Sequence, residues 1–148
     1  PLIYSSAQGY TGVVSLLLSN RQVKENAPLD DALINAANYG HEDTIKTLLE
    51  IPRVNPSARD NAAILYASGN QHAGIVRTLL SDSRLKRSDG LDQALINAAR
   101  FGHKEIVMLL LASSQIDPSA QNSSALTSAS RNGHAEIVEI LLRNTKLN

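Results

Sequence analysis

Four histidines are the residues of this chain best suited to chemistry, because imidazole can bind a metal ion or act as a general base near neutral pH. They are His41, His72, His103 and His134, and they are equally spaced along the sequence. The chain has no cysteine, which excludes thiol nucleophiles, disulfides, zinc ribbons and iron–sulfur centres. One active site would not need four histidines at a single regular spacing, so the spacing must be explained first.

The same 31-residue interval recurs in many other columns of the sequence. Pairs of leucines stand at 17–18, 48–49, 79–80, 110–111 and 141–142, and neighbouring columns stay β-branched, aliphatic or small. The stretch LINAA occurs at 33–37 and again at 95–99, which indicates duplication of a two-repeat unit. We predict a single repeat domain over 1–148, with repeats at about 1–29, 30–60, 61–91, 92–122 and 123–148.

Each repeat is predicted to form two short helices and an extended connection. Side chains that favour helix N-caps fill one column, at Asp30, Asn61, Asp92 and Ser123. Glycines at 40, 102 and 133 then end the first helix, since glycine adopts the left-handed conformation without steric cost. Because helices this short are unstable alone in water, the copies must stack into an all-α solenoid with a core along its whole length.

The repeat pattern resembles the ankyrin repeat. Residues 102–111 (GHKEIVMLLL) and 133–142 (GHAEIVEILL) are similar to the family segment G-H-x-E-[IV]-V-x-L-L. The period is shorter than the family's usual period of about 33 residues. The T-P-L-H opening is absent, and the segment after the second helix is shortened. The resemblance implies about five stacked ankyrin-like helix-turn-helix repeats that bind proteins and have no enzymatic activity. It leaves open whether the fingers form β-hairpins.

A regular stack leaves little room for a metal or catalytic site at the histidines. Packed helices lie about 8–10 Å apart, whereas metal ligands lie about 2 Å from the ion. We therefore expect all four histidines to be structural, each bonding backbone at the turn between its two helices. No metal, cofactor or catalytic residue is expected, and no phosphate-binding glycine loop or metalloprotease histidine pair occurs.

Positions that vary between copies lie three and four residues apart on the first helix, so they share one exposed face. Four of the five aromatic residues fall on this face, and aromatic residues and arginine are the usual anchors of protein interfaces. We predict that a partner protein binds there, on the concave inner-helix surface. The alternative is that Tyr39 and Phe101 pack on a neighbouring repeat. The candidate binding residues are Tyr4, Asn35, Asn38, Tyr39, Tyr66, Asn70, Arg100, Phe101, Arg131 and Asn132.

Charge and hydropathy argue against two other classes of partner. Fourteen basic and fourteen acidic residues cancel, so the basic excess typical of nucleic-acid binding is missing. The short basic run of Arg84, Lys86 and Arg87 is expected to be a solvated loop or, alternatively, to contact an acidic patch of the partner. No apolar run approaches the roughly 18 residues of a membrane span.

The chain begins and ends inside a repeat, so we expect it to be part of a longer one. We expect a monomeric segment in the cytoplasm, or in the host cytoplasm if the protein is an effector. Its function would be that of a protein–protein interaction scaffold. The alternative is a regulatory or targeting module of a larger multidomain enzyme or of a host-directed effector.

Overall fold

A computed structural model describes the backbone of residues 1–116 and 118–145, and the side chains of 1–116 and 123–144. The described chain is helical and contains no strand. Its helices are α1 (Leu2–Ala7), α2 (Thr11–Ser19), α3 (Arg21–Asn26), α4 (Leu29–Tyr39), α5 (Glu42–Leu49), α6 (Ala58–Gly69), α7 (Ala73–Ser81), α8 (Asp89–Phe101), α9 (Lys104–Leu111), α10 (Pro118–Arg131) and α11 (Ala135–Thr145).

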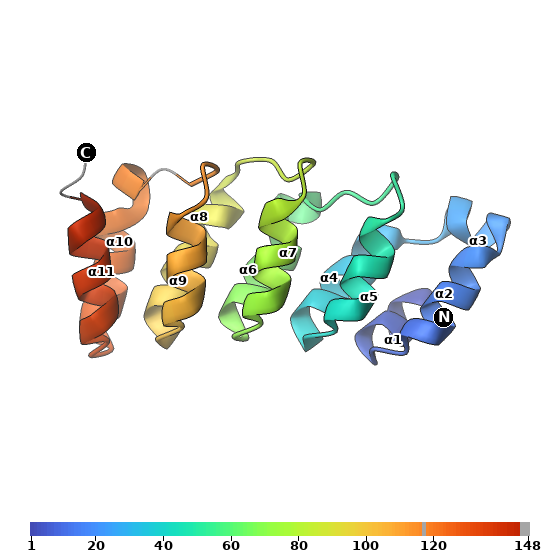
Figure 1. The fold of residues 1–148 in the computed structure, drawn as a ribbon, viewed down its shortest axis with the longest axis horizontal. Coiled ribbons are helices and arrows are strands. Elements are labelled where there is room, and N and C mark those ends of the chain that lie inside the picture. Colours follow the sequence, from blue (N-terminus) through green and yellow to red (C-terminus); the bar gives the residue numbers. More distant parts are fainter. Residues whose placement is uncertain (117, 146–148) are drawn as a thin grey trace.

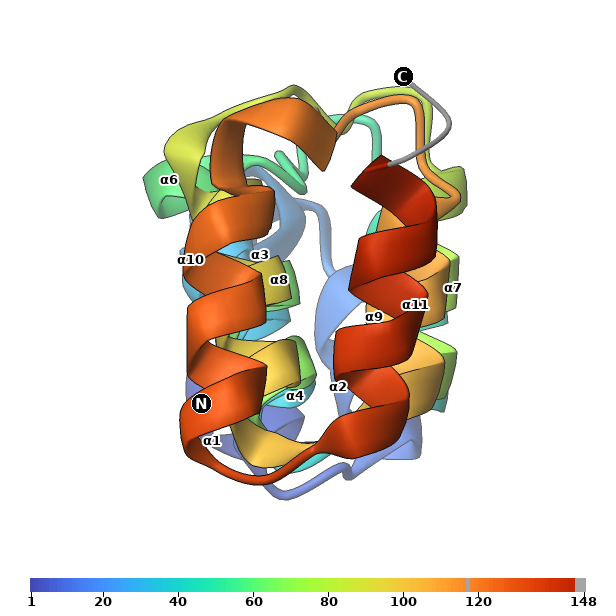
Figure 2. The same cartoon turned by 90° about the vertical axis from the view of Figure 1, so that its left-hand side faces the viewer.

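The helices form antiparallel pairs that stack side by side along one axis, as Figure 1 shows. The first helices of the pairs, α1, α4, α6, α8 and α10, each contact the next one in the row. The second helices, α2, α5, α7, α9 and α11, make a parallel row, so the molecule has two layers (Figure 2). We call these the inner and the outer helices. The predicted all-α solenoid of stacked helix pairs is confirmed.

Glycine ends the inner helices because the turn requires a left-handed residue. Gly40 follows α4 with φ of 83°, and Gly102 follows α8 with φ of 79°. A side chain at such a φ brings Cβ close to the backbone, which glycine avoids. In the third repeat this column holds Gln71, which takes φ of 65°. The turn between the helices of the third repeat therefore carries a backbone strain that glycine avoids in the other repeats.

The predicted N-cap bonds do not form. Asp30, Asp92 and Ser123 lie inside helices rather than before them. Asn61, with φ of 59°, does lie directly before the regular part of α6, but its Oδ1 accepts no hydrogen bond. The Asp30 carboxylate instead accepts a hydrogen bond from the backbone N–H of Asn55 at 2.8 Å, and Asn61 Nδ2 donates to the carbonyl oxygen of Lys86 at 2.8 Å. These polar side chains tie an inner helix to the connection that leads into the next repeat.

The core is aliphatic along its whole length. Leucines of the outer helices such as Leu48, Leu79 and Leu110 are fully buried between the two layers. The connections add a column that the sequence analysis did not include, at Val54, Leu85 and Ile116, each of them buried. All five aromatic residues of the chain are exposed, so none of them builds this core.

The prediction that the basic run is a solvated loop is wrong for Arg84, although Lys86 and Arg87 are exposed. The Arg84 guanidinium donates to the carbonyl oxygens of Leu49 at 2.8 Å and of Val54 at 3.1 Å, both in the preceding repeat. Asp82 fixes it with two bonds of 2.6 and 2.9 Å. Arg53, in the same column of the repeat before, reaches back in the same way to the carbonyl oxygen of Lys24 at 2.7 Å.

Candidate functional site

The exposed positions of α1, α4, α6, α8 and α10 form a continuous surface, here called the inner-helix face. Tyr4, Tyr39, Tyr66 and Phe101 lie on it and are 65%, 58%, 47% and 53% exposed. The alternative in which Tyr39 and Phe101 pack into a neighbouring repeat is therefore wrong. Rings left in water on a rigid scaffold are available to a partner without rearrangement of the core.

An asparagine bridge joins two neighbouring inner helices on this face. Asn70 Nδ2, just after α6, donates to both the backbone oxygen and the Oδ1 of Asn38 on α4, at 3.0 and 2.9 Å. Asn35, one turn before Asn38, donates its Nδ2 to the carbonyl oxygen of Asp31 at 2.8 Å. The described contacts leave Oδ1 of Asn35 and Nδ2 of Asn38 available for further hydrogen bonds.

Asn35 and Asn38 line a groove of about 510 Å³ between α4 and α6. Its floor is apolar and its rim carries Asn35, Asn38 and Tyr66, three of the predicted binding residues. Arg59, which also lines the groove, forms an ion pair of 2.6 Å with Asp31. The residues that line the groove are Ile34, Asn35, Asn38, Arg59, Ala62, Leu65 and Tyr66.

The inner-helix face becomes basic toward the C-terminal end. Arg100 and Arg131 are exposed and lie in the last turns of α8 and α10. The Arg100 guanidinium lies 5.5 Å from the centre of the Phe101 ring, a cation–π distance. Within residues 1–116 and 123–144, neither arginine has an ion-pair partner. Asn132, also exposed, donates its Nδ2 to the carbonyl oxygen of Ser128 at 2.8 Å.

Each of the four histidines donates a hydrogen bond from Nε2 to a backbone carbonyl oxygen of the preceding repeat, rather than to its own turn. The acceptors are Ala7, Asn38, Gly69 and Arg100, at 2.9, 3.2, 3.0 and 3.0 Å. A Cβ added to Gly40 would lie 2.6 Å from the ring of His72, so that glycine also makes room for the imidazole. The histidines thus fasten successive turns to one another along the edge of the inner-helix face.

No described group of three or more His, Asp or Glu side chains could hold a metal ion. The histidine bonds use Nε2, and each ring belongs to a different repeat. The geometry therefore assigns the imidazoles to contacts between repeats.

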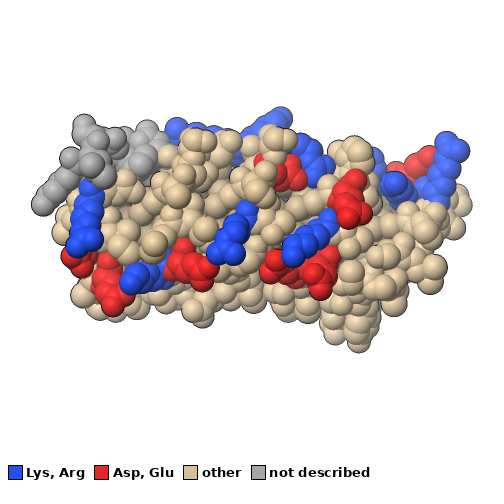
Figure 3. All heavy atoms as spheres, viewed as in Figure 1, with Lys and Arg blue, Asp and Glu red and all other residues tan. Residues whose placement is uncertain are grey.

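The outer helices present a different surface, on which opposite charges alternate (Figure 3). Arg77 pairs with Glu105 at 2.8 Å and Lys104 with Glu136 at 2.9 Å, each pair joining adjacent repeats. The hydrogen bond from Lys104 lowers the pKa of Glu136. Exposed pairs of this kind contribute little to stability. The surface over α2 differs, since α2 has no charged residue and exposes Val13 and Leu16.

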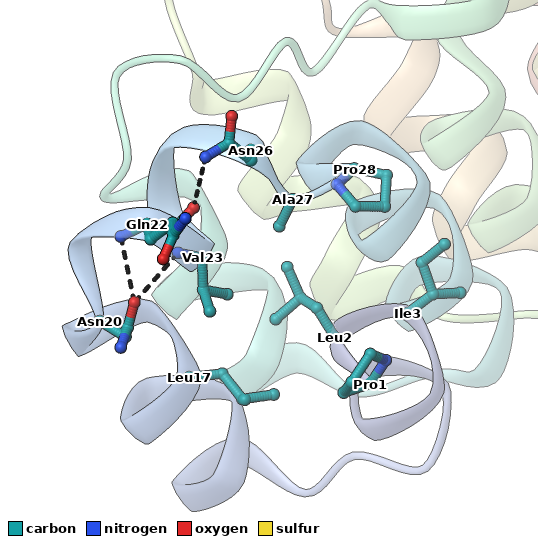
Figure 4. Close-up of a pocket in the computed structure, with 10 residues that line it drawn as sticks. All are labelled: Pro1, Leu2, Ile3, Leu17, Asn20, Gln22, Val23, Asn26, Ala27 and Pro28. Carbon is teal, nitrogen blue, oxygen red and sulfur yellow. Dashed lines mark hydrogen bonds between the residues drawn. The ribbon is translucent and has the colours of Figure 1, made fainter.

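A second hollow, of about 500 Å³, lies at the N-terminal end of the stack (Figure 4). Leu2, Ile3 and Leu17 line it from α1 and α2, and Val23 lines it from α3. Leu17 is partly exposed, whereas its counterparts Leu48 and Leu79 lie against a preceding helix pair and are fully buried. The hollow therefore exposes part of the surface through which repeats stack.

The family model described as ankyrin repeats (3 copies) matches residues 2–89 and, in an overlapping second match, residues 64–148. No curated protein matches the chain. Among the described residues, no helix combines the length and the apolar character needed to cross a membrane.

Proposed function

Because this chain belongs to the ankyrin repeat family, whose members generally act as protein–protein interaction modules, we propose that it binds a partner protein through the inner-helix face. One observation carries the proposal. The stack buries aliphatic side chains in every repeat, yet it leaves Tyr4, Tyr39, Tyr66 and Phe101 exposed on one face. Aromatic side chains are strongly enriched among residues that dominate binding energy.

The inner-helix face binds a partner with side chains that the rigid stack already holds in position. The carbonyl bonds of the histidines and of Arg84 hold adjacent repeats in register. The inner-helix side chains therefore keep fixed spacings before a partner arrives, which reduces the entropy lost on association. The proposal involves no catalytic step and no cofactor.

The apolar surface around Leu16 on α2 is the main competitor of the inner-helix face. A photo-crosslinking amino acid placed in turn at positions 39, 16 and 108 separates the two surfaces, with Met108 as an exposed site on the outer helices. We expect specific adducts from position 39 in cells of the source organism, and none from 108. Adducts from position 16 alone would assign binding to the N-terminal end of the stack and overturn the proposal.

A further inference from the structure

We propose that the groove between α4 and α6 and the neighbouring surface at Gly69 hold the extended main chain of an acidic peptide segment, two carboxylates of which pair with Arg100 and Arg131. This inference rests on the proposed function and adds the chemistry of the partner. It follows from three features of the inner-helix face: unused amide groups, a missing side chain and unpaired positive charge.

The groove carries hydrogen-bonding groups that match a peptide unit. Asn35 keeps an acceptor at Oδ1 and Asn38 keeps donors at Nδ2, because their bonds to Asp31 and Asn70 use the opposite ends of the two amides. An extended main chain offers one donor and one acceptor per residue, which such a pair of amides can satisfy. The apolar floor of Ile34, Ala62 and Leu65 takes a side chain of the same segment.

Gly69 leaves space for the main chain of the peptide next to the groove. It belongs to the column that holds Asn38, Arg100 and Arg131 in other repeats, so the middle repeat lacks a side chain there. Gly69 lies in α6 without positive φ, and a Cβ added to it would meet nothing within 4 Å. Neither backbone conformation nor packing therefore requires glycine at this position. Close approach of a ligand backbone is a use of glycine that fits this position.

Two arginines place positive charge at the C-terminal ends of the next two inner helices, α8 and α10. The described acidic residues of the inner helices lie in the first turns, at Asp30, Asp31, Asp60, Asp89 and Asp92. Arg100 and Arg131 lie in the last turns, at the opposite end of the helices. A ligand that crosses this edge meets two guanidinium groups with no competing carboxylate among the described residues of the last turns. Carboxylates are their natural partners, since arginine binds them through two parallel hydrogen bonds.

The spacing of the repeats sets the spacing of the carboxylates. Arg100 and Arg131 occupy the same column of adjacent inner helices, and packed helices lie about 8–10 Å apart. An extended chain in the polyproline II conformation advances about 3.1 Å per residue with three residues per turn, so its residues i and i+3 point to the same side about 9 Å apart. Two carboxylates about three residues apart in the peptide therefore reach the two arginines together, while the residues before or after them cover Gly69 and the groove.

The test uses fluorescein-labelled 14-residue peptides rich in proline and alanine, because proline favours the polyproline II conformation. One carries two aspartates at positions i and i+3, a second carries them at i and i+1, and a third has lysines at i and i+3. Fluorescence polarisation should show that the first binds the chain at least about tenfold more tightly than the third. The i, i+1 peptide should fall between them because only one of its carboxylates reaches a guanidinium.

Variants of the chain assign the site. Arg100→Glu combined with Arg131→Glu should reverse the preference toward the lysine peptide, whereas Lys24→Glu combined with Lys86→Glu, exposed elsewhere, should leave the order unchanged. Gly69→Ala should weaken binding about tenfold without lowering the midpoint of thermal unfolding, so loss of fold cannot explain its effect.

Equal binding of the aspartate and lysine peptides, or binding that both charge-reversal variants change alike, would overturn the inference. Failure of every peptide to bind below about 1 mM would do the same. If position 39 still forms specific cross-links in that case, the proposed function stands and the partner docks as a folded surface rather than as an extended acidic segment.

Discussion

Arg84 Nη2 donates a 2.8 Å hydrogen bond to the carbonyl oxygen of Leu49, the last residue of α5. The carbonyl groups at a helix end have no partner within the helix. Arg84, in the next repeat, supplies a hydrogen-bond donor to one of these carbonyl groups and is itself bound by Asp82. A side chain in a connection thus stabilises the helix end of its neighbour.

Replacement of Arg84 by Met should therefore lower the free energy of unfolding by about 2–4 kcal/mol, because several carbonyl oxygens and the Asp82 carboxylate lose a charged donor. Urea denaturation measures the loss. Lys86→Met is the matched control, since Lys86 lies in the same connection and is exposed. Similar small losses in both variants would show that the Arg84 bonds contribute nothing beyond a surface charge.

Asp82 makes the same contact dependent on pH. The hydrogen bond from Arg84 lowers the pKa of Asp82, although partial burial opposes the effect. The folded-state pKa lies below the unfolded value of about 3.9, so the stabilisation is complete above pH 4 to 5 and is lost as pH falls through the folded-state pKa.

Asp82→Asn should accordingly cost about 1 kcal/mol or more at pH 7. The difference from the parent chain should shrink progressively below about pH 4. Urea midpoints measured from pH 7 to pH 2.5 test the sign. A difference that grows on acidification would contradict the role assigned to Asp82.

Replacement of Gln71 by glycine should increase the stability of the fold. It takes φ of 65° in the column where other repeats have glycine, and a left-handed residue with a Cβ costs about 1–2 kcal/mol. Gln71→Gly should raise the free energy of unfolding by about 1 kcal/mol.

The reciprocal change, Gly40→Ala, should lower it by at least as much, because the added Cβ also meets the ring of His72. Calorimetric midpoints of the two variants should move in opposite directions. A loss of stability in Gln71→Gly would show that the glutamine side chain makes a contact worth more than the strain.

Zinc should leave the stability unchanged. Each imidazole uses Nε2 to bond the carbonyl oxygen of a different repeat, so binding a metal through that nitrogen would break a contact between repeats. Titration with Zn²⁺ followed by differential scanning fluorimetry measures this. A rise in the unfolding midpoint that saturates at one equivalent would assign a specific metal site to the histidines.

The sequence predicted the helix pairs, their stacking and the exposed aromatic residues, because the aliphatic columns and the variable columns recur at the same interval in each copy. The path of the connections could not be predicted in this way. Arg84 and Arg53 also share a column of the repeat, yet their role depends on where the loop passes the preceding helix end. The N-cap prediction failed for the same reason. Asp30 and Asn61 have suitable side chains for capping, but the connections supply closer partners.

The histidines show a second limit of prediction from the sequence. Its spacing predicted a structural role, but the acceptor lies in the preceding repeat, across the boundary between repeats. The groove beside Tyr66 also could not be predicted from the sequence, because it is lined by side chains of two different repeats, such as Asn38 and Ala62, whose distance apart depends on how the repeats pack.

The most direct test of partner binding through the inner-helix face is capture of the partner by a variant in which Tyr39, Tyr66, Arg100 and Phe101 are all alanine. All four are exposed, so the change should lower the free energy of unfolding by less than about 2 kcal/mol. Binding through the inner-helix face predicts that this variant loses capture while circular dichroism shows an intact fold, and that a Leu16→Ala, Met108→Ala control captures normally. Undiminished capture by the folded four-site variant would contradict it.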